Sequence, residues 1–323
     1  MEIKYMSRQE VAEKLDMKTC ISLMENVFMG FAKGEIKNIL RSVAPLPGGV
    51  LGVMPGVIPK DKTAGAKLIT VIHDNSKRNL PSHQGIVAVF NSDDGTLKGV
   101  CDGTSITAIR TGAVSGLATK YMAREDAKVL CLIGGGVQAE QNLDAVIVVR
   151  PIQQVNIWCR NPEKAAEFVK KHSRRYPGVK FTPFSDCSKA VEDADVICTV
   201  TPGKEIVLKG RWVKPGAHIN AVGACAAAER EADGECVAKS RFFGDSIGSV
   251  KAESGEYLIA KKDGLIDESH ILGDLADIVS GKKKARESKE DITMFESLGL
   301  AEEDIICADY LLKILPTSKF IIR

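Results

Sequence analysis

A short apolar segment that runs into a cluster of glycines constrains the fold of this chain most. Residues Val129–Ile133 read Val-Leu-Cys-Leu-Ile, three glycines occupy 134–136, and residues 138–146 are compatible with a helix. A strand that passes through a glycine-rich turn into a helix is the context that a dinucleotide-binding fingerprint needs. The pattern therefore predicts a Rossmann-type unit that begins at this strand.

Small residues occupy the three positions of the turn that such a fingerprint requires to be small. Gly134 allows a tight turn, Gly136 lets a pyrophosphate approach the backbone, and Ala139 lets the helix pack closely against the strand. The free N–H groups and the positive dipole end of the helix would then hold the phosphates. The alternative is a glycine turn without a ligand, which the flanking segments disfavour.

Length and composition narrow the class of protein. A chain of 323 residues exceeds a typical single core, so two domains are expected. A net charge of +2 leaves no electrostatic footprint for nucleic acid. The basic run at 282–286 is short and follows an apolar segment, which predicts a solvated helix end. No apolar stretch approaches the roughly 20 residues that span a bilayer.

Cysteine usage and the N-terminus indicate the compartment. The nine cysteines are scattered without a Cys-x-x-Cys pair, so neither a zinc site nor a disulfide framework is expected. The first residues lack an apolar signal-peptide core. We therefore expect a cytoplasmic protein without a metal.

The first half of the chain does not follow a strand–helix alternation. Residues 7–10 form a capping-box pattern, and the apolar spacing over 18–33 predicts a helix. Residues 41–100 contain β-branched runs between turn signals, which predict a sheet with long loops. A helix rich in small residues is expected over 107–123.

After Lys128 the pattern becomes strand, helix, strand. This alternation implies a parallel sheet with helices on both faces. The predicted fold class is therefore α/β, a Rossmann-type doubly wound parallel sheet beside a mixed α+β domain, and a last amphipathic helix is expected over 304–315. The expected strands are 128–133, 154–159, 195–200, 217–222 and 241–244, and the expected helices between them are 137–147, 162–175 and 186–193.

The residues at the end of the second parallel strand indicate which nicotinamide cofactor the chain prefers. In NAD-binding folds an acidic residue at this position takes the ribose 2′-hydroxyl, whereas here Cys159 is followed by Arg160 and Asn161. A guanidinium can pair with a 2′-phosphate in a forked geometry. The sequence therefore favours NADPH over NADH, unless Arg160 is simply an exposed residue at a strand end.

Three basic residues of the first half stand in apolar or small-residue surroundings. Arg41 follows an apolar pair, Lys67 begins an apolar run, and Arg110 lies in the predicted helix 107–123. Basic groups in such surroundings need an anionic partner. A substrate carboxylate would satisfy the arginines bidentately and the lysine as a point charge. For each residue alone, a structural salt bridge or solvent exposure remains the alternative.

Taken together, several segments resemble the ornithine cyclodeaminase/mu-crystallin family. The resemblance extends over nearly the whole chain and is more specific than the glycine turn alone. It is carried by Leu51-Gly-Val-Met-Pro55, Lys67-Leu-Ile-Thr70, Pro81-Ser-His-Gln84, Asp102-Gly103, Arg110-Thr111, Gly134-Gly-Gly-Val-Gln-Ala139, Lys214-Pro-Gly-Ala-His-Ile-Asn-Ala-Val-Gly223 and Ser297-Leu-Gly-Leu300.

The resemblance implies a homodimer of two-domain subunits. Residues 1–121 and 302–323 would form the substrate-binding and dimerisation domain, and residues 122–301 the dinucleotide-binding domain. Arg41, Lys67 and Arg110 match the residues that hold the substrate carboxylate. The cofactor positions are Gly134, Gly136, Val137 and Gln138 at the pyrophosphate turn, Thr199, Val200, Thr201, Val222 and Gly223 on the nicotinamide side, and Thr111, Arg160 and Asn161.

Within the family the chain resembles the mu-crystallin branch, whose members resemble NADPH-dependent ketimine reductases. The supporting segments are Pro81-Ser-His-Gln84, Trp158-Cys-Arg160 and Glu253-Ser-Gly-Glu256. One departure concerns proton transfer. Cyclodeaminases carry an Asp soon after the Asn-Ala-Val-Gly stretch, and Cys225 occupies that position here. A thiol with a reference pKa of about 8.5 is mostly neutral at pH 7 and does not replace a carboxylate.

These residues predict an NADPH-dependent reductase of an α-imino acid, such as the cyclic ketimines pyrroline- or piperideine-2-carboxylate, that gives an L-amino acid. Lys67 could bind the carboxylate, relay a proton, or both, and His83 is a second possible proton donor unless it is structural. Cys225 is either a small residue beside the nicotinamide or a contributor to proton handling. The alternatives are an ornithine or lysine cyclodeaminase or amino-acid dehydrogenase with an altered proton relay, and a non-catalytic NADP-dependent binding protein.

Overall fold

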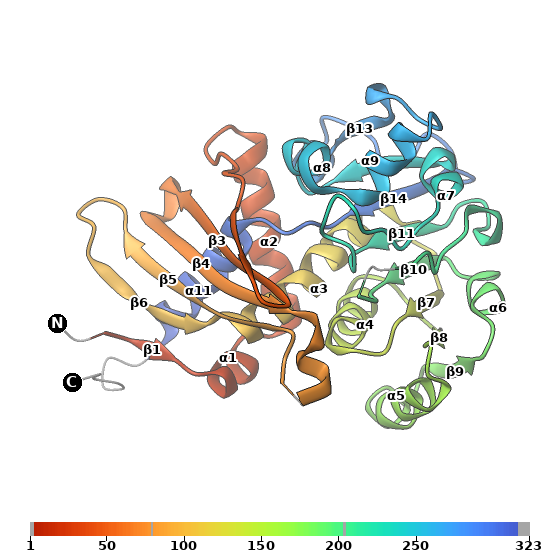
Figure 1. Ribbon diagram of the computed structural model, residues 1–323, viewed down its shortest axis with the longest axis horizontal. Coiled ribbons are helices and arrows are strands. Elements are labelled where there is room, and N and C mark those ends of the chain that lie inside the picture. The colour runs from red at the N-terminus through yellow and green to blue at the C-terminus, as the bar shows by residue number, and fades with distance from the viewer. Residues whose placement is uncertain (1–2, 79, 203–204, 316–323) are drawn as a thin grey trace. The chain divides into compact units, whose positions relative to one another are not determined.

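The chain folds into two compact units. The computed structural model describes residues 3–78, 80–202 and 205–315 (Figure 1). One unit holds the residues up to Arg110 and those from Gly299 onward, and the other is Thr111–Leu298. The division falls within α3 (Gly103–Met122). In the described part of the chain no helix is both long and apolar enough to cross a membrane.

The first unit contains a six-stranded mixed sheet, in the region where a sheet was predicted. Its order is β1-β6-β5-β4-β3-β2, and every neighbouring pair is antiparallel except β1 with β6. The strands are β1 (Tyr5–Met6), β2 (Ser42–Leu46), β3 (Gly49–Ile58), β4 (Thr63–Ile72), β5 (His83–Asn91) and β6 (Leu97–Asp102), with short 3-10 helices η1 (Pro59–Asp61) and η2 (His73–Arg78) between them.

Helices cover one face of this sheet. α1 (Arg8–Lys14) begins with the predicted capping box, in which Ser7 and Glu10 satisfy each other's backbone N–H groups. α2 (Met17–Ala32) buries the apolar stripe read from the sequence. α11 (Ala301–Ile314) packs against α2 and against β3, β4, β5 and β6 (Figure 1). A segment from the end of the chain thus completes the core of the first unit.

The second unit is built on an eight-stranded parallel sheet, so the predicted doubly wound fold class is confirmed. The order β13-β12-β14-β11-β10-β7-β8-β9 changes direction between β10 and β7. Ligands of such sheets bind at the carboxyl ends of the strands beside this switch point. The strands are β7 (Val129–Ile133), β8 (Gln154–Trp158), β9 (Lys180–Phe184), β10 (Val196–Thr199), β11 (His218–Ala221), β12 (Ser240–Gly244), β13 (Ile271–Asp274) and β14 (Ile292–Glu296).

Successive residues of the central strands bury opposite faces of this sheet. Leu130 and Leu132 of β7 pack with α4 and α5, whereas Cys131 and Ile133 pack with α6, α7 and α9. Both faces are therefore dry, as a parallel sheet requires. The helices are α4 (Val137–Val149), α5 (Pro162–Arg175), α6 (Cys187–Val191), α7 (Gly234–Lys239), α8 (Ile247–Glu253), α9 (Gly255–Lys262) and α10 (Leu275–Val279), with η3 (Gly210–Trp212) and η4 (Glu268–His270).

Three strands of this sheet, β9, β13 and β14, were missed by the sequence prediction. β9 and β13 are the two edge strands, and Pro183 within β9 weakens the strand signal. β14 is buried between β11 and β12 but follows a polar segment. Its position in the sheet depends on tertiary pairing that no local pattern shows.

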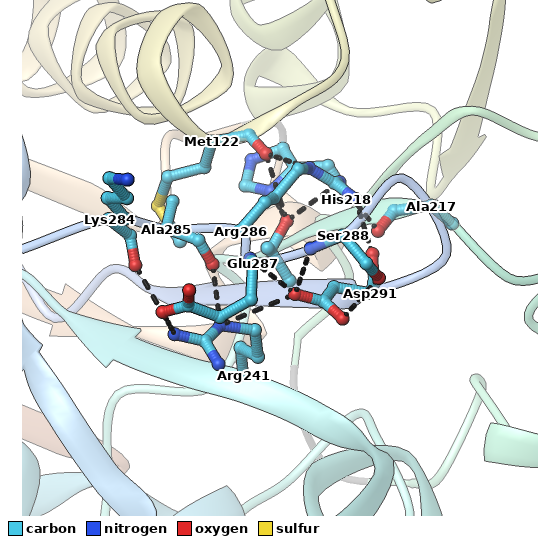
Figure 2. A network of polar contacts seen from close by, with 11 residues as sticks. Met122, Ala217, His218, Arg241, Lys284, Ala285, Arg286, Glu287, Ser288 and Asp291 are labelled. Carbon is cyan, nitrogen blue, oxygen red and sulfur yellow. Dashed lines mark hydrogen bonds and ion pairs between the residues drawn. The ribbon is translucent and has the colours of Figure 1, made fainter.

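The prediction of a solvated helix end at 282–286 was wrong at its last two residues, the first of which, Ala285, is buried. Residues 282–284 are exposed. Arg286 instead donates hydrogen bonds to the carbonyls of Met122 (2.6 Å) and Ala217 (3.1 Å) and to the hydroxyl of Thr293 (3.1 Å) (Figure 2). This guanidinium fastens the segment before β14 to the start of β11 and the end of α3.

Candidate active site

The glycine turn after β7 has the geometry that a phosphate-binding turn requires. Gly134 adopts φ +119°, and a Cβ there would lie 2.8 Å from the carbonyl oxygen of Val200. Gly136 is the N-cap of α4, has no atom within 4 Å of a Cβ position, and makes no side-chain cap. The start of this 13-residue helix therefore has no side-chain cap, and Val137 is 59% exposed. These residues fit a pyrophosphate group.

The end of β8 places a thiol and a guanidinium beside this turn. Cys159 is buried, and a Cβ on Gly135 would lie 2.7 Å from its Sγ atom. Arg160 is exposed and donates a hydrogen bond of 2.7 Å to the equally exposed Glu205. Asn161 caps α5 by accepting from the N–H of Glu163 at 2.9 Å. The sequence prediction for Arg160 did not include this acidic partner.

The ends of β10 and β11 are tied together. The carbonyl of Thr199 accepts hydrogen bonds of 3.1 Å from the N–H groups of both Val222 and Gly223. Glu231 then accepts from the N–H of Gly223 (2.7 Å) and from the N–H (2.7 Å) and hydroxyl (2.6 Å) of Thr201. Burial raises the pKa of Glu231 to about 7, although its hydrogen bonds with Thr201 oppose the rise. Sequence reasoning missed Glu231.

The first unit brings together two of the predicted carboxylate-binding residues around an acid. Lys67 on β4 donates to Oδ2 of Asp304 at 2.7 Å, and Arg110 on α3 donates through Nε to Oδ1 at 3.2 Å. Lys67 is 2% exposed, Arg110 5% and Asp304 0%. The salt bridge that the sequence left open as an alternative is therefore present at both Lys67 and Arg110.

The neighbouring contacts extend this cluster. Arg110 Nη1 donates to Oε2 of Glu303 at 2.7 Å, and Arg41 Nη2 donates to the carbonyl of Gly299 at 3.0 Å. Gly299 has φ +84°, and a Cβ there would lie 2.7 Å from Nη1 of Arg110, so only glycine fits beside the guanidinium. With Lys67 and Asp304 included, three cations face two carboxylates. Arginine and lysine side chains gathered in this way can bind an anionic ligand.

Asp304 opposes the effects of burial and of the neighbouring arginines on the pKa of Lys67. Burial, Arg110 and Arg41 lower the pKa of Lys67, while Asp304 raises it, and the result is a pKa of about 8. Burial alone would raise the pKa of Asp304, but Arg110 and Lys67 outweigh burial and hold it below its usual value. Lys67 is therefore mostly an ammonium at pH 7 but can lose its proton near neutrality.

Residues 1–315 match the family model described as the ornithine cyclodeaminase/mu-crystallin family. The chain belongs to this family. Ketimine reductase mu-crystallin of Rattus norvegicus is 37% identical over 310 residues, which are 94% of this chain and 95% of that protein. The resemblance stated from the sequence segments is thus confirmed over almost the full length.

Two solved structures of the family share the fold. The Δ1-pyrroline-2-carboxylate reductase of Thermococcus litoralis, solved with NADH and L-proline, is 36% identical, covers 97% of both chains and has a TM-score of 0.93. An archaeal alanine dehydrogenase dimer with bound NAD is 29% identical, with a TM-score of 0.91 over 97% of this chain and 96% of that chain. These proteins bind a nicotinamide cofactor in the fold that this family member adopts.

The remaining predicted site residues have no hydrogen bond to the cation cluster among the contacts described above. His83 pairs with Val71, four residues or about 13 Å along β4 from Lys67, and its Nδ1 is 3.0 Å from Ser82 Oγ. Cys225 is exposed, lies after β11 and forms no disulfide with a described residue. Gln138 lies in the first turn of α4, and Thr111 is buried within α3.

Proposed function

We propose that this family member is an NADPH-dependent reductase of α-imino acids that produces L-amino acids. Cyclic ketimines such as pyrroline-2-carboxylate or piperideine-2-carboxylate are the proposed substrates. The observation that carries the proposal is that the buried side chains of Lys67 and Arg110 are held together on the carboxylate of Asp304, because paired cations of this kind can bind a substrate carboxylate. The two relatives named as ketimine and pyrroline-carboxylate reductases support the same reaction class.

In this proposal the arginines of the cluster bind the substrate and the lysine donates a proton. Arg41 and Arg110 bind and orient the substrate carboxylate, because guanidinium groups match its two oxygens. Lys67 donates a proton to the imine nitrogen, since its ammonium can release a proton near neutral pH. The bound cofactor supplies the hydride that the imine carbon accepts. The protein contributes orientation and electrostatics.

The position of Cys225 favours imine reduction over amine oxidation. Oxidation of an amino acid requires a base that accepts a proton from an ammonium group, and the family position that carries Asp in cyclodeaminases holds this thiol. Reduction of a preformed imine needs only a proton donor, which Lys67 provides. We therefore place the cyclodeaminase and dehydrogenase activities second.

NADPH is proposed as the preferred cofactor because Arg160 follows β8 where the ribose of the cofactor would lie, and Cys159 provides no carboxylate. The relatives solved with NADH or NAD show that the family also uses the unphosphorylated cofactor. Glu205 beside Arg160 reduces the expected preference, because an acid repels a 2′-phosphate.

A substrate screen tests the proposed reaction. Oxidation of NADPH is followed with pyrroline-2-carboxylate, piperideine-2-carboxylate and acyclic imino acids, beside ammonia release from ornithine and lysine. We expect the native protein to oxidise NADPH with a cyclic ketimine. The Lys67→Ala variant should have a kcat/KM that is about ten- to a hundredfold lower, because charge-assisted contacts contribute about 1.5–3 kcal/mol. Lys98→Ala, which removes another lysine of the sheet that pairs with α11, is the matched control. Ammonia release without NADPH oxidation would contradict the proposal.

We also propose a homodimer formed through the sheet of the first unit. Apolar side chains of its strands are exposed, and Leu68 lies opposite Ile86 on neighbouring strands. Exposed apolar surfaces of this kind mark association sites, and the archaeal alanine dehydrogenase is a dimer. Leu68→Asp should yield a monomer in analytical ultracentrifugation, while the exposed Val148→Asp on α4 should leave the mass unchanged. A native protein that sediments as a monomer would refute the dimer.

A cytoplasmic location is proposed because none of the nine cysteines, which all lie in the described part of the chain, forms a disulfide. This includes Cys20 and Cys307, although their sulfur atoms lie 3.6 Å apart. A reducing compartment keeps such pairs as thiols. Mass spectrometry of the protein unfolded and alkylated directly on cell lysis, without a reductant, should therefore count nine alkylated cysteines. A lower count would contradict the proposed compartment.

A further inference from the structure

Asp304 is the group through which the cations of the first unit are joined. It lies in the first turn of α11 and is fully buried. Its Oδ2 accepts from Lys67 at 2.7 Å, and its Oδ1 accepts from Arg110 Nε at 3.2 Å and from the Thr107 hydroxyl at 3.3 Å. A buried carboxylate with three donors is fixed in position, and it fixes the lysine in turn.

We propose that Asp304 is a positioning residue for Lys67, holding its Nζ in place as an ammonium that donates the proton to the imine nitrogen. The inference rests on the proposed imine reduction. In that step the N–H bond of Nζ breaks and a bond from the proton to the imine nitrogen forms, while the imine carbon accepts the hydride. Lys67 is left as a neutral amine and regains its proton from water.

The charges around Lys67 explain why it needs this partner. Arg110 and Arg41 both disfavour the ammonium, as does burial, and Asp304 opposes all three. The residues opposite Lys67 on β3 and β5 are the apolar Met54 and Val87, so the neighbouring strands offer no carboxylate at this register.

The other titratable groups of α11 near the cluster are accounted for by separate contacts. Glu303 pairs with Arg110, Glu302 lies against Gly56 of β3, and Cys307 lies beside Cys20 of α2. Asp304 is therefore the acidic residue of α11 that binds Lys67 directly.

The same helix offers a matched control. Asp309 is also buried on α11, at 1% exposure, and pairs with Lys98 of β6 at 2.8 Å and with Lys313 at 2.6 Å. Asp309→Asn removes a helix-to-sheet ion pair of the same kind without altering a contact of Lys67. Its effect on stability measures what the loss of such a pair costs the fold alone.

The experiment compares Asp304→Asn, Asp304→Glu and Asp309→Asn with the native protein in the pH dependence of kcat and kcat/KM for ketimine reduction. The fall in activity at high pH, which we assign to deprotonation of Lys67, is the alkaline limb of the profile. Asp304→Asn should move this alkaline limb to a pH at least one unit lower and should lower kcat at pH 8 tenfold or more. Asp304→Glu should restore the limb, because it keeps the charge. Asp309→Asn should lower the melting temperature and leave the limb unmoved. An unmoved limb in a folded Asp304→Asn protein would overturn the proposal.

A readout without turnover separates this inference from the proposed reaction. The 13C NMR signal of Lys67, assigned through Lys67→Arg in lysine-labelled protein, reports its protonation directly. We expect a midpoint near pH 8 in the native protein and a lower midpoint in Asp304→Asn. If the midpoint falls in Asp304→Asn but the native protein reduces no ketimine, the proposed reaction is refuted. The effect of Asp304 on the protonation of Lys67 is then still established. A neutral Lys67 at pH 7 in the native protein would refute the inference even if Asp304→Asn did not fold.

Discussion

The carboxylate of Glu231 accepts a hydrogen bond of 2.7 Å from the backbone N–H of Gly223, just beyond the end of β11. Its other oxygen accepts from the N–H and hydroxyl of Thr201, beyond the end of β10. One buried side chain thus joins the two strand ends that the family resemblance assigns to the nicotinamide side. The geometry of these strand ends depends on an oxygen acceptor at both positions.

Replacing Glu231 with Gln should weaken cofactor binding. The side-chain NH2 of glutamine would face a backbone N–H at one of the two positions, and an unpaired buried donor costs about 1–3 kcal/mol. We expect the Kd for NADPH, measured by fluorescence titration, to rise about ten- to a hundredfold. Glu235→Gln, which removes an exposed charge on α7, should leave the Kd unchanged. An unaltered Kd in a folded Glu231→Gln protein would show that this tie does not shape the cofactor site.

Adding a methyl group at Gly223 should have a larger effect. Its Cβ would lie 2.2 Å from the carbonyl oxygen of Thr201 and 2.4 Å from Oε2 of Glu231, so the backbone itself must move. Gly223→Ala should therefore raise the Kd for NADPH and lower the melting temperature. Gly178→Ala, with no atom within 4 Å of its Cβ position, should change neither. Equal behaviour of the two variants would contradict the close approach of the strand ends.

The ion pair of Arg160 and Glu205 predicts opposite shifts in cofactor preference. Arg160→Ala should lower kcat/KM for NADPH more than for NADH, because the forked contact with a 2′-phosphate is lost. Glu205→Gln should raise the NADPH preference by a few-fold, because the competing carboxylate is gone and both side chains are exposed. The ratio of kcat/KM for the two cofactors measures both effects. Arg160→Ala with an unchanged ratio would remove the basis for the NADPH assignment.

Local patterns predicted the elements of this fold well where local physics determines them. The capping box at Ser7, the turn at Gly134 and the helix α5 follow from spacing and turn chemistry and were confirmed. Asp304 and Glu231 could not be found in this way. Acidic residues in a first helical turn are usually read as exposed groups that favour the helix dipole. Only the packing of α11 on a distant sheet shows that Asp304 is buried against Lys67.

The buried carboxyl group of Glu302 should make the free energy of unfolding depend on pH. It is fully buried in the first turn of α11, and its carboxyl oxygens have no hydrogen-bond partner among the described residues. Burial raises the pKa of Glu302 from 4.5 to about 7. Between these values the folded state binds a proton that the unfolded state lacks, so this residue makes the protein less stable as pH rises through that window.

Glu302→Gln should abolish this loss of stability. The variant should match the native protein near pH 4.5 and exceed it at pH 8 by up to about 3 kcal/mol, since each pKa unit corresponds to about 1.4 kcal/mol. Urea unfolding at both pH values measures the difference, and other titrating groups cancel because they are common to both proteins. Glu13→Gln on the exposed face of α1 is the control and should show no pH-dependent difference. The difference in free energy of unfolding between Glu302→Gln and the native protein could instead be the same at both pH values. Glu302 would then not titrate in this window, and another contact would stabilise its charge.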